Sequence, residues 1–151
     1  MHYALDTEFI DTPEGSHLIS LGLASLDGRD LYLEFDYPED KLTPWLNQNV
    51  VPHLTGNKVS FDVASKRIVE YCGPIQFRSK PKFWAMYGAY DWYWFCRIFG
   101  GMKQLPDWCP NKYVEATDYV GCFRMAQIDP QHNALTDAKA LVRTLRTLEV
   151  V

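Results

Sequence analysis

The chain has 151 residues, of which 47% are apolar and 23% are charged, and this composition predicts one soluble globular domain over residues 1–151. It argues against disorder and collagen-like repeats, and no stretch approaches the roughly 18 apolar residues that span a membrane. The formal net charge of −4 disfavours a protein that holds duplex nucleic acid by bulk positive charge, but it allows an enzyme that meets phosphates through divalent cations.

The first part of the chain has the alternating pattern of β-strands. Strands are predicted over residues 2–9, 17–26 and 30–35. A polar segment at 11–16, which contains Pro and Gly, is expected to be a loop, and the Asp-Gly pair at 27–28 a tight turn. Because the connections are short, the three strands are expected to form an antiparallel meander.

Helices and strands are both expected in the rest of the chain. Thr43 followed by Pro44 predicts a helix start, and the Gly-Gly pair at 100–101 predicts a helix end. The expected elements are a helix that starts at 43 and ends before 52, a helix at 60–72, a strand at 83–87, a helix at 90–99, a strand at 112–117, a short helix at 118–126 and a helix at 134–148. This order predicts an α/β fold in which helices cover a mixed sheet.

The last expected helix has the clearest amphipathic pattern. Its apolar stripe includes Ala134, Ala138 and Leu141. Asp137 lies at the edge of this stripe, so its carboxylate is expected to face the sheet, where it needs a metal ion or a hydrogen-bond donor. His132 precedes the helix in an expected loop, and a lone loop histidine is most often an exposed residue without a role.

Two acidic residues lie two positions apart on the first expected strand. Because side chains alternate along a strand, Asp6 and Glu8 point to the same face. Converging carboxylates repel each other, and a hard divalent cation with oxygen ligands relieves that repulsion. Taken alone, the pair is more commonly explained by a strand with one solvated face.

A third acidic residue, Asp91, lies after Gly88 at the expected junction of a strand and a helix. A carboxylate in the first turn of a helix is stabilised by the helix N-terminus, and alone it needs no other role. The carboxyl ends of buried strands often carry functional sites. The nearby rings of Tyr87 and Tyr90 could contact bases, although core packing explains most such rings more simply.

Three motifs follow one another along nearly the whole chain. They are Asp6-Thr7-Glu8-Phe9-Ile10, Gly88-Ala89-Tyr90-Asp91 and His132-Asn133-Ala134-Leu135-Thr136-Asp137-Ala138. Together they resemble the DEDDh branch of the 3′–5′ exonuclease superfamily, which contains proofreading exonucleases, oligoribonuclease and ribonuclease T. Their form is most similar to that of small stand-alone bacterial and phage exoribonucleases. The resemblance implies a ribonuclease-H-like fold.

The resemblance also implies a two-metal site. Two Mg²⁺ or Mn²⁺ ions would lie roughly 4 Å apart, with Asp6 bridging them, Glu8 and Asp137 on the ion beside the nucleophile, and Asp91 supporting the other. His132 would be the general base that takes a proton from the attacking water. The products would be 5′-nucleoside monophosphates.

The implied substrate is the 3′ end of single-stranded RNA, with single-stranded DNA as the alternative, and relatives are often homodimers. Thr7, Phe9 and Ile10 are the implied substrate contacts. Many members of the family have Asn where this chain has Tyr87, and a small polar residue where it has Phe9. Both departures leave the metal ligands intact and concern how the 3′ nucleotide is held.

Two other classes of function use overlapping residues. A catalytically weak nucleic-acid-binding module on the same fold would need no general base, so His132 argues against it. A metal-dependent phosphatase or endonuclease would share the carboxylates, and its products would distinguish it from an exonuclease.

The sequence predicts a cytoplasmic location. The chain reaches Asp6 and Glu8 without the apolar region of a signal peptide. The four cysteines, at 72, 96, 109 and 122, include no CxxC pair, which argues against a zinc knuckle or a thioredoxin-type site. Reduced thiols in a cytoplasm are therefore expected.

Overall fold

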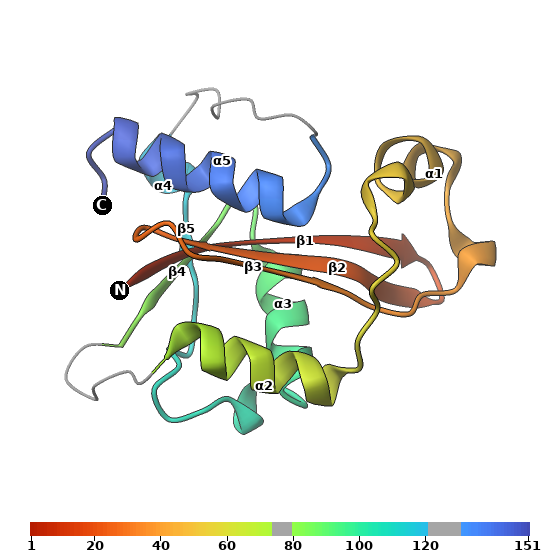
Figure 1. The fold of residues 1–151 in the computed structure, drawn as a ribbon, viewed down its shortest axis with the longest axis horizontal. Helices are drawn as coiled ribbons and strands as arrows, with labels where there is room; N and C mark the ends of the chain where they lie inside the picture. Colours follow the sequence, from red (N-terminus) through yellow and green to blue (C-terminus); the bar gives the residue numbers. More distant parts are fainter. Residues whose placement is uncertain (74–79, 121–130) are drawn as a thin grey trace.

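A mixed sheet lies between two layers of helices (Figure 1). The computed structural model describes residues 1–73, 80–120 and 131–151. Within these residues the sheet has five strands, β1 (His2–Thr12), β2 (Gly15–Ser25), β3 (Asp30–Glu34), β4 (Lys82–Ala85) and β5 (Val114–Glu115), in the order β3-β2-β1-β4-β5. The first three strands are antiparallel neighbours, whereas β4 runs parallel to β1 and β5 parallel to β4. The predicted α/β class and the antiparallel meander are confirmed.

The hairpin between β1 and β2 is longer than the sequence predicts. Residues 11–16 are expected to form a loop, but Asp11 pairs with Ser16 and Thr12 pairs with Gly15, so two residues alone make the turn. The loop prediction is wrong because the hairpin tip is solvated. Its polar side chains carry no alternating apolar signal, although the backbone ladder continues through them.

Helices cover both faces of the sheet. They are α1 (Pro44–Asn49), α2 (Phe61–Cys72), α3 (Ala89–Ile98), α4 (Thr117–Val120) and α5 (Ala134–Thr147), with 3₁₀ turns at Glu39–Lys41, Val51–His53 and Met102–Gln104. In Figure 1, α5 lies on one face of the sheet and α2 and α3 lie on the other, while α1 lies beside the far ends of β1 and β2. No helix in the described part of the chain combines the length and hydropathy needed to cross a membrane.

The predicted starts of α1 and α2 are confirmed by their capping hydrogen bonds, whereas two predicted strands are shorter than expected. The Thr43 hydroxyl accepts a hydrogen bond from the backbone N–H of Leu46 at 3.2 Å, and Ser60 caps α2 in the same way. The strand expected at 83–87 ends at Ala85. The strand expected at 112–117 has only two residues, Val114 and Glu115, which pair with Trp84 and Ala85 of β4, and α4 begins at Thr117. Of the helix expected at 118–126, residues 121–126 lie outside the described residues.

The sheet buries a core on each face, and the alternation along β1 determines which residue enters which core. Tyr3 and Leu5 pack with Phe83 and Phe95 on the side of α2 and α3. Ala4 packs on the opposite side, against α5. Asp6 and Glu8 continue the alternation of Ala4, so their side chains emerge on the face that α5 covers.

Candidate active site

A glycine in β2 determines how closely α5 approaches the acidic positions of β1. Gly22 is the register partner of Asp6 across the β1–β2 ladder. A Cβ atom at Gly22 would lie 2.3 Å from the backbone carbon and oxygen of Ala134 and 2.4 Å from the backbone nitrogen of Leu135. The first turn of α5 therefore lies directly against the sheet beside Asp6, and this contact brings Asp137 toward β1.

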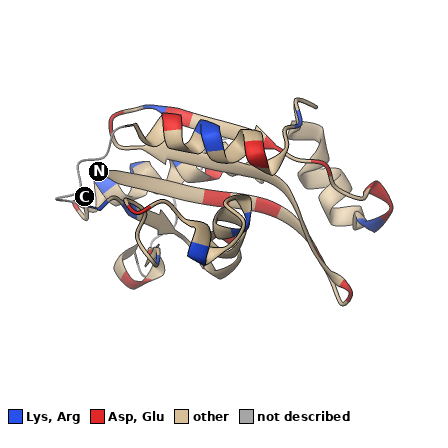
Figure 2. Cartoon of the chain, turned by 90° about the horizontal axis from the view of Figure 1, so that it is seen from below, with Lys and Arg blue, Asp and Glu red and all other residues tan. Residues whose placement is uncertain are grey.

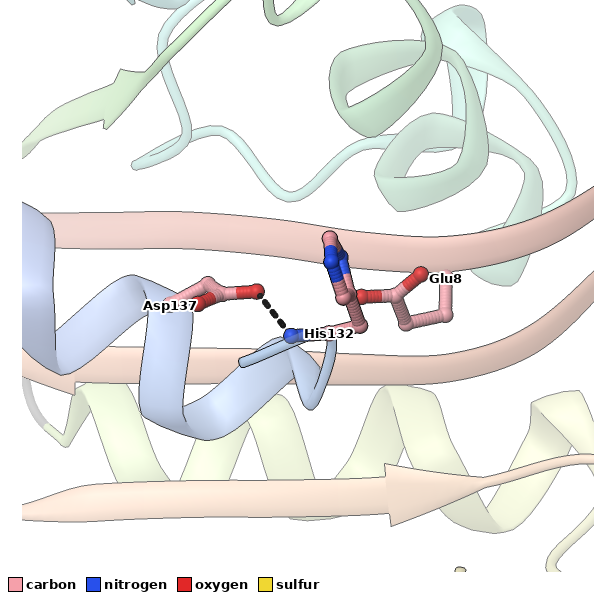
Figure 3. A group of neighbouring side chains, drawn as sticks. All are labelled: Glu8, His132 and Asp137. Carbon is pink, nitrogen blue, oxygen red and sulfur yellow. Dashed lines mark hydrogen bonds between the residues drawn. The ribbon is translucent and has the colours of Figure 1, made fainter. Parts of the chain in front are cut away.

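Glu8, His132 and Asp137 form a cluster at this contact (Figure 3). One carboxylate oxygen each of Glu8 and Asp137 and one ring nitrogen of His132 lie within 4.8 Å of one another. The backbone N–H of His132 donates a hydrogen bond of 3.0 Å to Oδ2 of Asp137. Figure 3 shows the Glu8 carboxylate beside the His132 ring, with the Asp137 carboxylate pointing toward the His132 backbone. Residues from opposite ends of the chain thus meet at one point.

His132 lies outside the helix, as predicted, in the residues just before α5. Its backbone is left-handed, with φ of 61°, a conformation that non-glycine residues adopt rarely. Asn133 caps the helix by accepting a hydrogen bond of 3.1 Å from the backbone N–H of Thr136. The His132 ring makes an edge-to-face contact with the ring of Trp45 on α1, with 4.7 Å between the centroids. Trp45 and the Asp137 carboxylate thus hold the ring and the backbone of His132 from different elements.

Asp91 approaches from the first turn of α3, on the other side of β1. Its side chain is only 6% exposed, and the Thr7 hydroxyl donates a hydrogen bond of 2.5 Å to its Oδ1. Thr7 lies between Asp6 and Glu8 on β1 and points to the opposite face. The same three-residue segment therefore connects Asp91 with the acidic pair.

The three implied substrate contacts have different surroundings. Thr7 is buried against Asp91, and Ile10 is fully buried with Ile19 in the small core beneath α1. Phe9 is partly exposed and stacks on the ring of Tyr90 at a centroid distance of 4.6 Å. Of these three side chains, Phe9 is therefore the one that a substrate could reach. Its contact with substrate stays a prediction.

Burial raises the pKa values of the four acidic residues, and neighbouring negative charges raise those of Asp6 and Glu8 further. Burial raises the pKa of Asp6 well above its ordinary value, and the charges of Asp91, Glu8 and Asp137 raise it further. Burial, followed by the charges of Asp137 and Asp91, raises the pKa of Glu8 to about 8. Burial raises the pKa of Asp91 to about 6, against the opposing hydrogen bond from Thr7, and it also raises the pKa of Asp137. The repulsion expected between Asp6 and Glu8 thus extends to all four carboxyl groups.

Comparison with known proteins decides the family. The family model of the Rv2179c-like 3′–5′ exoribonuclease domain matches residues 1–148. The chain belongs to this family. The predicted class of enzyme, a 3′–5′ exoribonuclease, is thereby confirmed.

Two relatives agree with this placement in the Rv2179c-like family. The 3′–5′ exoribonucleases Rv2179c and MT2234.1, from two strains of Mycobacterium tuberculosis, are each 29% identical to this chain over 156 residues. Each match covers 98% of this chain and 93% of the relative. A chain in the structure of the yeast NOT1 MIF4G domain co-crystallized with CAF1 covers 99% of this chain, with a TM-score of 0.56 and 12% identity. That likeness concerns the fold alone.

The sequence did not reveal two residues that the structure of this Rv2179c-like chain brings to the site. Trp45 contacts His132, although α1 is far away in sequence. Glu115, at the end of β5, accepts hydrogen bonds from the backbone between β4 and α3. Neither residue belongs to one of the three motifs, and a contact between distant segments leaves no local pattern.

Proposed function

We propose that this exoribonuclease removes nucleotides one at a time from the 3′ end of single-stranded RNA and releases 5′-nucleoside monophosphates. Asp6, Glu8, Asp91 and Asp137 hold two Mg²⁺ or Mn²⁺ ions, and His132 is the general base. The observation that carries the proposal is the meeting of Glu8, His132 and Asp137 within 4.8 Å.

The four acidic residues fit a divalent cation. The charges of neighbouring carboxyl groups raise the pKa values of Asp6 and Glu8, and positive charge placed among them would counteract that repulsion. Hard cations such as Mg²⁺ and Mn²⁺ prefer carboxylate oxygens. Bound there, such ions would lower the pKa of the attacking water and stabilise negative charge on the phosphoryl group.

The chain itself supplies the proton acceptor and its support. A ring nitrogen of His132 lies in the same cluster as the carboxylates of Glu8 and Asp137, where the attacking water would be held. The hydrogen bond from the His132 backbone N–H to Asp137 fixes the backbone at His132. The edge-to-face contact with the Trp45 ring restricts the His132 ring. A general base needs such positioning because proton transfer requires a heavy-atom distance of about 3 Å.

We assign the chain to the DEDDh branch and its fold to the ribonuclease-H-like type. Support comes from the order of the strands, in which three antiparallel strands are followed by two parallel ones. The acidic pair lies on the central strand β1, and the other two carboxylates come from α3 and α5 on opposite faces. The histidine five residues before Asp137 distinguishes this branch.

The charge distribution favours single strands over duplexes. In the described residues of Figure 2, Lys and Arg lie on several separate elements instead of forming one continuous basic stripe. Duplex binding depends on many neutralised phosphates, whereas single strands are also held by stacking of bases on aromatic rings. The rings of Phe9 and Tyr90, which are next to Glu8 and Asp91 in sequence, stack on each other and would offer such a surface.

An end-labelled single strand tests the proposal. Matched RNA and DNA oligonucleotides, labelled at the 5′ end, are incubated with the purified protein and Mn²⁺. A ladder of RNA shortened stepwise from the 3′ end, absent with excess chelator and with the His132→Ala variant, supports it. Faster loss of DNA would replace RNA by DNA as the substrate. Internal cuts, release of inorganic phosphate or full activity in chelator would each contradict the proposed mechanism.

A further inference from the structure

The Glu115 carboxylate, at the end of β5, connects two turns that leave the sheet at the same edge. Its Oε1 accepts hydrogen bonds from the backbone N–H of Tyr87 at 2.9 Å and from the hydroxyl of Thr117 at 3.0 Å. Its Oε2 accepts one from the backbone N–H of Gly88 at 3.1 Å. The backbone N–H of Thr117 also donates to Oε1, at 3.2 Å. One carboxylate thus fixes the start of α3 and the start of α4.

The turn that Glu115 holds is strained. Tyr87 has a left-handed backbone, with φ of 53°, and its side chain is 80% exposed. A bulky residue in this conformation is unfavourable unless its surroundings enforce it. The exposed Tyr87 ring makes little packing contact that could offset the backbone strain. The backbone N–H of Tyr87 itself donates to Glu115, so this hydrogen bond supports the strained residue directly.

The same turn places Asp91. β4 runs parallel to β1 with Trp84 opposite Ala4, so the residues that follow β4 come level with Asp6 and Glu8. Gly88 is the N-cap residue of α3, and it has no side chain to cap the helix. A Cβ atom there would lie 2.3 Å from that of Ala85. A conventional capping side chain is therefore excluded, and the Glu115 carboxylate instead accepts from the backbone N–H groups of the two residues that lead into the helix, Tyr87 and Gly88.

We propose that Glu115 is a positioning residue of the active site, which holds the Tyr87–Gly88 turn in its strained conformation and thereby places Asp91 for metal binding. The inference rests on the proposed function, because it assumes that Asp91 binds a divalent cation. Asp91 is then fixed from two directions, by the Thr7 hydroxyl and by the turn that leads into α3. A residue that merely strengthened the β4–α3 connection would affect stability without affecting metal binding.

The Glu115→Gln variant tests the inference through the metal response of the folded protein. The amide group of glutamine presents N–H donors where the carboxylate accepts from backbone N–H groups, so the turn loses part of its support. We measure the melting temperature during a Mn²⁺ titration, which requires no turnover. The Mn²⁺ dissociation constant fitted to this titration, called the Mn²⁺ midpoint below, should increase about tenfold, which corresponds to one lost charge-assisted hydrogen bond. An unchanged midpoint would overturn the inference.

Asp27→Asn is the matched control. The Asp27 carboxylate also fixes a turn, by accepting from the backbone N–H of Arg29 at 3.2 Å and from its Nε at 2.9 Å. This turn follows β2 near the beginning of β1, away from the cluster. The control should lose stability and keep the wild-type Mn²⁺ midpoint. A shift as large as that of Glu115→Gln would make the effect one of general stability and would overturn the inference.

A second substitution tests the route from Glu115 to Asp91. Glycine adopts the left-handed conformation without strain, so adding Tyr87→Gly to Glu115→Gln should bring the Mn²⁺ midpoint back toward that of the wild type. This double variant also serves if Glu115→Gln alone is too unstable to measure. A double variant that folds but keeps the shifted midpoint would refute the role of the turn. If the wild-type protein itself showed no rise with Mn²⁺, the proposed metal site would fail first, and with it this inference.

Discussion

Adding one methyl group at Gly22 should separate His132 and Asp137, at the start of α5, from Glu8 on β1. Gly22 is opposite Asp6 on β2, and its missing side chain leaves room for the first turn of α5. The Cβ atom of a Gly22→Ala variant would lie 2.3 Å from backbone atoms of Ala134. Backbone cannot rotate aside as a flexible side chain can, so the N-terminal end of α5 has to move.

The size of that movement sets the expected effect. Carbon atoms in contact prefer separations of about 3.5 Å, so the helix end must retreat by about 1 Å. Overpacking of this kind destabilises by about 1–3 kcal/mol. Glycine in a strand is itself unfavourable by about 0.5–1 kcal/mol relative to alanine, so without the clash the substitution would stabilise. A displacement of about 1 Å at reacting groups lowers the rate roughly 100-fold, because His132 and Asp137 move away from Glu8.

Thermal melting and the initial rate on 3′-end substrate measure the two effects separately. The melting temperature should fall by about 2–4 °C for each kcal/mol lost. Ala24→Gly, two residues along the same strand and on the same face, is the control, because it removes a methyl group from the core beneath α5. The control should be destabilised and keep its rate. Gly22→Ala with a wild-type rate would refute the claim that this close approach assembles the site.

Three further predictions concern the side chains of the site. His132→Ala should keep the fold and the Mn²⁺-induced rise in melting temperature but cleave about 10²–10⁴-fold more slowly, and a near-normal rate in a single-turnover assay would place the base elsewhere. Thr7→Val removes the hydroxyl that donates a hydrogen bond to Asp91 and keeps its pKa down, so the rate at neutral pH should fall about tenfold, the value of one hydrogen bond to a charged group. A pH–rate profile identical to that of the wild type would contradict this. Without metal, Glu8 and Asp91 bind protons more tightly in the folded state than in the unfolded state, because their pKa values are raised. The free energy of unfolding should therefore fall as the pH rises from about 4.5 toward 8. Saturating Mn²⁺ or the Asp6→Asn substitution should reduce that fall, as measured by melting at a series of pH values. A melting temperature that rises with pH in chelator would disprove this last reasoning.

The sequence predicts what depends on local periodicity. Asp6 and Glu8 share a face because strand side chains alternate, and β1 shows this alternation in its two cores. The apolar stripe of α5 predicts that Asp137 turns toward the sheet, and the structure places it beside Glu8. Thr43 and Ser60 mark helix starts because a capping hydroxyl acts on a residue three positions away.

The sequence does not predict what depends on contacts between distant segments. Glu115 accepts a hydrogen bond from Tyr87, which is 28 residues earlier. No motif in the sequence around Tyr87 indicates that a distant carboxylate supports its turn. In the sequence Trp45 is an ordinary first-turn residue of the helix that becomes α1, and only the fold shows that its ring contacts His132. Gly22 interrupts an apolar strand, and its reason becomes visible only with the backbone of α5 against it.

Locally unfavourable features gather around this one site. In the described residues, three non-glycine residues have a left-handed backbone, and two of them, Tyr87 and His132, flank the acidic cluster. Gly22 weakens the centre of a strand, and Glu8 belongs to a set of carboxyl groups that repel one another. Elsewhere helix caps, alternation and core packing mostly agree with the fold, as expected for a sequence with little frustration; the exceptions include the left-handed Glu149 and the buried Nε1 atoms of Trp92 and Trp94, which have no hydrogen-bond partner among the described residues. Gly22, Tyr87 and His132 each help to bring a carboxylate or an imidazole toward the others, so the local costs at these residues serve the binding of a cation and the activation of a water.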